Sequence, residues 1–454
     1  MLGAFANSLK IPELRKKIIF TFLVLAVCRL AATIPVPNID PEALASLFES
    51  LTKNSTSSGV VGILNIFSGG ALQKFAIAAL GIMPYISASI IMQLMTPVMP
   101  FLERLSREGE DGRQKITQYT RYLAVFICLI QGTMLAKSME NPGKLGLPNI
   151  QIVINPGLTF EITTVIILLA GTLILMWLGE QITARGIGNG ISMIIAANII
   201  NRMPAAIAAM IKLVYSTTPG AGQSFTIIHV LLLIAFFLIV CALAICLTLG
   251  IRKIPVKYAS RMVGHKTSKG QTTYMPLRVN HSGVMPIIFG SAILMFPTML
   301  FRYVEFLNPY AYLWNYGSAS YIAFFALAII LFAFFWVANQ FNPIQIADDL
   351  KKHGAYVPGV RPGKPTAQFL DHTMTRITVV GSLSLVLLAT IPMLLAKKFG
   401  IPGMIAQFFG GTSLLIIVGV TLDTVRQIES QLLARRYDGF FKKGKIKSRQ
   451  RRGY

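Results

Sequence analysis

Ten apolar stretches, most of them long enough to cross a lipid bilayer, constrain the fold of this 454-residue chain more than any other feature. A membrane-spanning helix needs about 20 predominantly apolar residues. Charged residues make up 13% of the chain, about half of the roughly 25% that is typical of soluble domains. The sequence therefore predicts an all-α polytopic membrane protein and excludes an ordinary soluble enzyme, a coiled coil and a disordered chain. The stretches cover residues 18–34, 75–97, 118–136, 158–178, 187–213, 227–249, 284–301, 321–337, 377–395 and 404–420.

The positive charges divide unevenly between the segments that join these stretches. If the N-terminus lies inside, the interior segments carry 32 of the 42 Lys and Arg residues, the exterior segments carry nine, and Arg29 lies within the first span. Cytoplasmic loops of membrane proteins carry an excess of Lys and Arg, and shifting one span would remove the bias. We therefore expect ten spans with both termini in the cytoplasm. Residues 1–17 would form a cytoplasmic N-terminal segment and residues 426–454 a basic cytoplasmic tail.

An internal repeat relates the second and seventh spans. Residues 81–91 and 283–293 share the frame G-x-M-P-x-I-x-x-S-x-I at a separation of 202 residues. Chance similarity is common among apolar sequences, so coincidence is the alternative interpretation. If the repeat is real, the chain has two halves of five helices each, over residues 18–214 and 227–425. An odd number of helices per half inverts the second half in the membrane, and such proteins place their functional path between the halves.

The spans offer little that catalysis or ion coupling would need. Proton relays and ion-coupled transporters bury Asp, Glu, His or Arg in mid-span, and these spans contain almost none. The sequence has no zincin, nucleophile-elbow or phosphate-loop motif, and its four cysteines form no Cys-x-x-Cys pair. We therefore predict no catalytic residue, no metal and no cofactor. An inverted-repeat solute transporter stays open as the alternative to a channel.

Two further patterns concern the space between the halves. Residues 55–74 are short, rich in Ser and Gly and apolar in the middle, which indicates a re-entrant segment on the exterior side. Isoleucines recur at a spacing of four residues in the second and fifth spans, and others lie in the seventh and tenth. From the spacing alone, ordinary helix packing is the simpler interpretation. These isoleucines are Ile82, Ile86, Ile191, Ile195, Ile288 and Ile416.

Four longer motifs are more specific than these spacings. They are GIMPYISASIIMQL at 81–94, GIGNGIS at 186–192, ADDLKKHGAYVPGVRPGKPT at 347–366 and FGGTSLLI at 409–416. They resemble the bacterial SecY family, the central subunit of a protein-conducting channel, and the resemblance extends over essentially the whole chain. It implies two inverted five-helix halves around an hourglass pore, in the cytoplasmic membrane of a bacterium. Such a channel passes unfolded polypeptides across the membrane and releases membrane helices laterally into it.

The resemblance also implies roles for particular residues. The six isoleucines match a constriction ring, and branched apolar side chains make a dry ring that resists ions. The second and seventh helices match a lateral gate through which signal sequences and nascent membrane helices reach lipid. The gate residues would be Ser87, Gln93, Thr96, Phe289 and Phe296. The residues that match the plug of the outer funnel are Ile63, Leu64, Asn65, Ile66, Phe67, Ser68, Gly69, Gly70, Ala71, Leu72 and Gln73.

The large interior loops, 250–283 and 343–376, match docking sites for the ribosome and for the SecA ATPase. Ribosomal RNA presents phosphates, which basic side chains suit. Positive charge that only sets topology is the alternative interpretation of the first loop. The expected partners also include the SecE and SecG subunits, signal sequences and nascent chains, and anionic lipids near the basic tail. The docking residues would be Arg252, Lys253, Lys257, Arg261, Lys266, Lys269 and Arg361.

Overall fold

The computed structural model describes most of the chain, including three of the four motifs in full and residues 412–416 of the fourth. It covers residues 11–53, 68–140, 151–215, 227–258, 262–263, 266–267, 272–303, 313–314, 317–399, 405 and 412–443. The predicted plug residues 63–67 and the predicted docking residues Arg261 and Lys269 lie outside these ranges.

The first half of the chain is helical, and proline and asparagine mark several helix starts. Prolines occupy the first turn of α2, α5 and α6, where a missing backbone N–H costs nothing. The Asn189 side chain accepts hydrogen bonds from the N–H groups of Ile191 and Ser192 and so caps α9. The helices are α2 (Pro12–Ala31), α3 (Pro41–Lys53), α5 (Met83–Met95), α6 (Pro100–Arg107), α7 (Glu110–Glu140), α8 (Leu158–Arg185), α9 (Gly190–Asn201) and α10 (Met203–Tyr215).

The second half repeats this organisation with a small sheet added. Its helices are α11 (Ile227–Leu249), α12 (Met285–Tyr303), α13 (Ala319–Gln340), α14 (Pro343–Lys352), α15 (Lys364–Phe399) and α17 (Thr412–Lys443). Its strands are β1 (Ile251–Tyr258), β2 (Met262–Val263), β3 (Lys266–Thr267), β4 (Thr272–Arg278) and β5 (Ala355–Tyr356).

The helices agree with the ten predicted spans, although two spans are broken. Six helices of the described ranges are long and apolar enough to cross a membrane, and α5 with α6 forms a seventh candidate that bends by 96°. Helices α2, α12 and α17 lie at three further predicted spans. The predicted start of the second span is wrong, because residues 75–82 form turns and the helix begins at Met83. Gly81 has φ +59° there, a conformation outside a right-handed helix.

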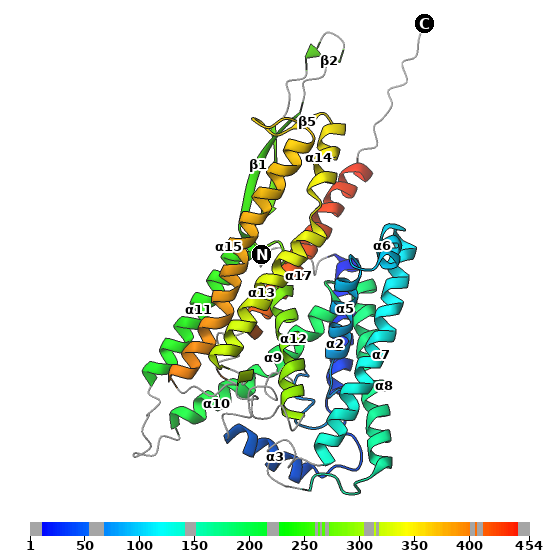
Figure 1. The fold of residues 1–454 in the computed structure, drawn as a ribbon, viewed down its shortest axis with the longest axis vertical. Helices are drawn as coiled ribbons and strands as arrows, with labels where there is room; N and C mark the ends of the chain where they lie inside the picture. Colours follow the sequence, from blue (N-terminus) through cyan, green and yellow to red (C-terminus); the bar gives the residue numbers. More distant parts are fainter. Residues whose placement is uncertain are drawn as a thin grey trace.

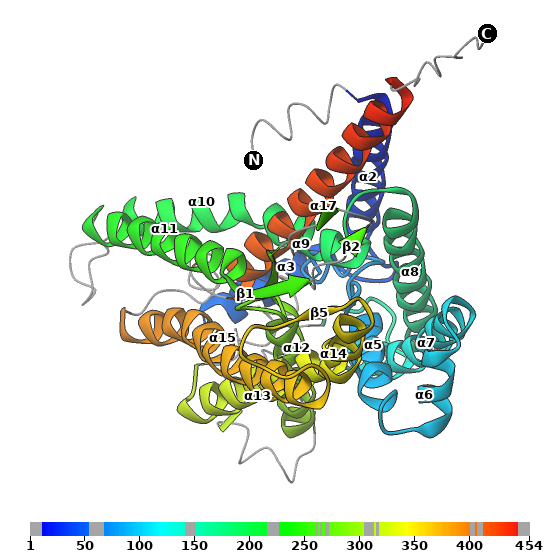
Figure 2. The same cartoon turned by 90° about the horizontal axis from the view of Figure 1, so that it is seen from above.

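The internal repeat is visible in how the helices pack. Helix α5 contacts α7 and α7 contacts α8, as α12 contacts α13 and α13 contacts α15. In the first half, α8 also contacts α2 and α9. In the second half, α15, which corresponds to α8, likewise contacts α11 and α17. Figure 2 shows α2, α5, α7 and α8 on one side of the molecule, α11, α13 and α15 on the other, and α9 and α12 toward the middle. Equivalent helices in chain order therefore have equivalent neighbours in the two halves.

The segments predicted to lie inside gather toward one end of the molecule. Figure 1 shows β1, β5, α14 and α6 toward its upper end and α3 at its lower end. One apolar cluster joins Leu14 and Ile18 of α2, Ile187 of the turn before α9, and Ile428 of α17. The early part of α2 and the later part of α17 therefore lie on the same side as the turn between α8 and α9.

The two large interior loops form one body rather than two separate loops. Strand β1 lies between β4 and β5 in a three-stranded antiparallel sheet. Lys257 pairs with Thr272 on β4 and with Tyr356 on β5. The buried side chains of Ile254 and Leu277 belong to an apolar cluster that continues into α15. The sheet thus fixes the loop after α11 to the loop after α14.

Candidate functional site

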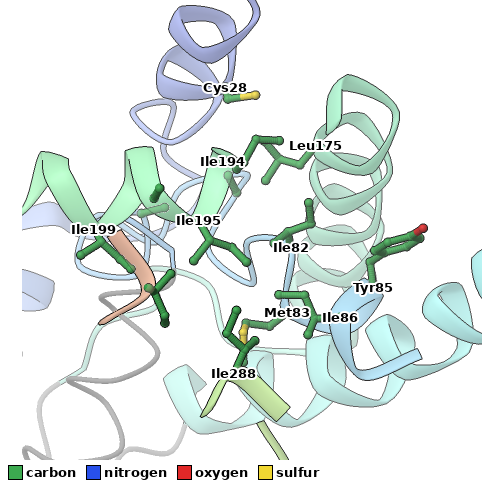
Figure 3. Packing of buried hydrophobic residues seen from close by; sticks show 14 of the residues in the cluster. Cys28, Ile82, Met83, Tyr85, Ile86, Leu175, Ile194, Ile195, Ile199 and Ile288 are labelled. Atoms are coloured by element: carbon green, nitrogen blue, oxygen red, sulfur yellow. The ribbon is translucent and has the colours of Figure 1, made fainter. Parts of the chain in front are cut away.

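Isoleucines from both halves meet in one buried apolar cluster. Their side chains come from the start of α5, from α9, from α12 and from α17, and each is 5% exposed or less. Ile191 is only partly buried and packs against the same cluster. Figure 3 shows Ile82, Ile86, Ile195 and Ile288 converging on a common centre. The structure therefore brings all six predicted isoleucines together, the five buried ones being Ile82, Ile86, Ile195, Ile288 and Ile416.

The same cluster contains further branched and sulfur-containing side chains that the sequence reasoning missed. Ile194, Ile199 and Met83 are buried in it, and Figure 3 shows them beside the isoleucines already named. Ile199 lies four residues after Ile195, so continuing the predicted spacing along α9 by one turn would have found it. Because these side chains are apolar, they offer water and ions no hydrogen-bond partner.

Helices α5 and α12, which carry the predicted lateral gate, contact each other across the boundary between the halves. On α12, the buried Phe289 ring packs edge-on against Phe332 and Trp336 of α13, with ring centroids 5.8 and 5.5 Å apart. Phe289 therefore braces α12 within its own half. Phe296 lies one to two turns further along α12.

The predicted gate residues of α5 are polar groups whose hydrogen bonds stay within their own helix. Ser87 is buried. The Thr96 hydroxyl donates to the carbonyl of Met92 at 2.7 Å. Gln93 donates from Nε2 to Oγ of Ser89 at 3.1 Å, and no donor of the described residues reaches its buried Oε1. The α5 side of the boundary thus holds polar atoms that, among the described residues, bond within α5 or lack a donor.

The described part of the predicted plug, residues 68–73, forms turns next to this cluster. Ser68, Ala71 and Leu72 are buried, and Ala71 belongs to the same cluster as the isoleucines. Gly69 has φ +66°, and a Cβ there would lie 2.7 Å from Nη1 of Arg29. Gly70 has φ +91°. Glycine suits both positions, because other residues rarely adopt this conformation.

The predicted docking residues of the sheet and of the turn after β5 face solvent. Arg252, Lys253 and Lys257 are exposed along β1, and Arg361 is exposed as well. Lys266 lies in β3. The turn that carries Arg361 is fixed by local hydrogen bonds: the Thr366 hydroxyl donates to the Arg361 carbonyl at 2.8 Å, and the Val360 N–H donates to the Val357 carbonyl at 3.1 Å. Residues 357–363 are thus turns rather than helix, as their prolines and glycines predicted.

Metal ligands do not gather within the described ranges: no group of three or more His, Cys, Asp or Glu residues there could hold a metal ion. The four cysteines are free thiols, of which Cys28 and Cys128 are buried, Cys241 is half-buried and Cys246 is exposed.

Sequence comparison identifies close relatives over nearly the full length. The model of the SecY family matches residues 76–425. The chain is 43% identical over 449 residues to a protein translocase subunit SecY of Streptomyces galbus, covering 97% of this chain and 100% of the relative. It is 40% identical over 451 residues to the corresponding subunit of Chlamydia trachomatis, covering 97% and 98%.

Solved structures share the fold at much lower identity. A protein-conducting channel matches with a TM-score of 0.64 at 17% identity, and Sec61 in a canine ribosome–channel complex matches with 0.61 at 16% identity. A SecY protein whose plug domain stabilises the closed state of its channel matches with 0.58 at 17% identity. Each match covers 92% of both chains. This is a multi-pass membrane protein with the fold of a translocation channel and is not an enzyme; the chain belongs to the SecY family.

Proposed function

We propose that this chain is the channel-forming subunit of a protein translocase in a bacterial cytoplasmic membrane. It passes unfolded polypeptides across the membrane and releases membrane helices laterally into lipid. The observation that carries this proposal is the cluster of buried isoleucines contributed by both halves. A channel for unfolded chains must exclude ions when empty and still accept any side chain. Apolar packing meets both demands, because it is dry and non-directional.

The isoleucine cluster argues against a solute transporter, the other function that this architecture supports. Transporters with inverted repeats bind their solute near the midplane with unwound backbone and polar groups. Between these halves lie Ile86, Ile195 and Ile288, each 5% exposed or less. Such a surface has no group that would select one solute over another.

The contact between α5 and α12 supports a lateral gate at that boundary. Parting these two helices would separate Ile86 from Ile288 and open the cluster sideways. Ser87, Gln93, Thr96, Phe289 and Phe296 are proposed to line the opening. Among the described residues, Oε1 of Gln93 has no hydrogen-bond donor, which favours this role, because a polar atom without a partner weakens the closed boundary.

We place the sheet, α14 and the turn around Arg361 on the cytoplasmic side, with both termini. The excess of Lys and Arg in these segments supports this orientation. Residues 63–73 are the proposed plug. The partners proposed for the cytoplasmic face are the SecA ATPase and ribosomal RNA. SecE and SecG subunits are expected in the membrane, together with anionic lipid at the tail. The basic residues proposed for docking are Arg252, Lys253, Lys257, Arg261, Lys266, Lys269 and Arg361.

Reconstitution tests this proposal directly. The chain is placed in lipid vesicles with SecE and SecG subunits and is supplied with SecA, ATP and a secretory protein that carries a signal sequence. We expect the secretory protein to become protected from external protease only when ATP and this chain are both present. Vesicles with the same partners but without this chain are the control. Equal protection in both vesicle types would contradict the proposal.

A further inference from the structure

Three polar side chains bind the described end of the plug segment. Arg29, in the last turn of α2, donates from Nη1 to the Gly69 carbonyl at 3.0 Å. Asn201, the last residue of α9, donates from Nδ2 to the same carbonyl at 3.3 Å. Arg202 follows α9 and donates from Nη2 to Oε1 of Gln73 at 2.8 Å. Two helices of the first half thus hold this short stretch at both of its ends.

The main-chain geometry at Gly69 makes this binding specific. The positive φ of Gly69 turns its carbonyl toward α2 and α9. A Cβ at this position would come 2.7 Å from Nη1 of Arg29 and 2.7 Å from Oδ1 of Asn198. A side chain at this position would have to displace the ends of Arg29 and Asn198. The donors therefore bind a backbone carbonyl at a position whose positive φ and close neighbours favour glycine.

Burial indicates that these contacts are more than incidental surface bonds. Arg202 is 7% exposed, and so is its neighbour on α9, Asn198. Removing a guanidinium from water is unfavourable unless hydrogen bonds replace the lost hydration. Gln73 supplies one such bond. A buried arginine within a charge-poor apolar stretch therefore indicates a specific acceptor.

The binding site adjoins the apolar cluster. Ala71, between Gly69 and Gln73, is fully buried in that cluster, and so is Ile199, two residues before Asn201. A displacement of residues 69–73 would therefore expose the isoleucines on this side. The polar contacts and the apolar cluster share α9 and act on the same stretch of chain.

The geometry points to an internal binding site, formed by Arg29, Asn201 and Arg202, whose ligands are the Gly69 carbonyl and the Gln73 amide. We name it the Gly69 latch. It keeps residues 68–73 seated beside the isoleucine cluster, and it is broken when the channel opens. This inference rests on the proposed channel function and adds to it the groups that hold the closed state.

Removing the donors tests the latch. Arg29→Met and Arg202→Met keep much of the side-chain length and delete the hydrogen-bond donors, whereas Arg29→Lys keeps the charge and one donor site. We expect each Met variant to raise the open probability of the resting channel in planar bilayers by about tenfold to a hundredfold, the range for losing a hydrogen bond to a charged group. Arg29→Lys should restore most of the closed state. Arg185→Met, at an exposed arginine that ends α8, is the matched control.

A second variant avoids any loss of packing. Gln73→Glu places a carboxylate against Arg202, and a charge-assisted bond is stronger than the one it replaces. We expect this variant to open less often and to translocate a secretory protein more slowly than wild type. Resting open probabilities at the wild-type level in all these variants would overturn the latch. If wild-type vesicles themselves fail to translocate while the conductance effects hold, the proposed function fails and the latch stands.

Discussion

Replacing Ile86 by Asn tests the isoleucine cluster as a seal. Ile86 is 5% exposed and lies among isoleucines from both halves. The substitution puts an amide where no polar partner is expected, and burying an unpaired amide costs about 1–3 kcal/mol. In an open channel the same amide faces water, so this cost falls on the closed state alone. Since about 1.4 kcal/mol is a factor of ten, the ratio of open to closed channels should rise by about 5- to 150-fold.

Single-channel recording in planar bilayers measures this ratio without any partner protein. Ile344→Asn makes the same chemical change at a position of α14 that is 67% exposed, and it should leave the conductance at rest unchanged. Ile288→Asn, on the other half, should act like Ile86→Asn, and the double variant should deviate from additivity if both residues close one seal. An unchanged resting conductance in both Ile86→Asn and Ile288→Asn would show that these residues do not form the seal.

Three further predictions concern the gate and the cytoplasmic face. A bifunctional thiol crosslinker that joins Ser87→Cys to Phe289→Cys should block translocation, measured by protease protection, and export at the normal rate after crosslinking would contradict a parting boundary. Arg361→Glu should lower SecA-driven export by about tenfold with subunit assembly intact. Export at the wild-type rate would contradict a docking role and would leave Arg361 as a positive charge that only sets membrane topology. Burial and the positive charge of Arg278 lower the pKa of His281 below its ordinary value of 6.5. The folded state therefore resists protonation, so thermal stability should fall as the pH drops below about 6.5, and His281→Phe should reduce that dependence.

The architecture was predictable because its signals are local. Apolar length and loop charge are read from neighbouring residues, and they agree with the helices and with the end at which α14 and the sheet gather. The shared frame at Gly81 and Gly283 correctly equated α5 with α12, whose neighbours are equivalent in the two halves. The six isoleucines needed the additional resemblance, since their spacing is also that of ordinary packing.

Features that depend on pairing between distant segments were not predictable in the same way, as a comparison of two strands of the sheet shows. Strand β1 has a local signal, because the buried Ile254 and Val256 alternate with exposed residues, a period-two pattern that indicates a strand. Strand β5 spans only Ala355–Tyr356, and nothing in two residues indicates a strand. It forms because Lys257 and Tyr258, about a hundred residues earlier, offer their backbone groups. The pairing of the two interior loops in one sheet therefore depends on tertiary contacts, which the sequence of neither loop indicates by itself.

The Gly69 latch was predictable in part, because its donors have a local signal in the sequence and their acceptors do not. Arg29 was visible in the sequence as a rare charge within the first apolar span, and Asn201 and Arg202 as polar residues that interrupt the fifth. A charge within an apolar span is energetically unfavourable unless a partner satisfies it. The presence of these rare charges therefore indicated that each has a hydrogen-bond partner. The partner of Arg29 is a main-chain carbonyl, which every residue carries and no motif can mark. That carbonyl is the acceptor because Gly69, with φ +66°, lies within hydrogen-bond distance of Arg29 and Asn201 in the folded chain.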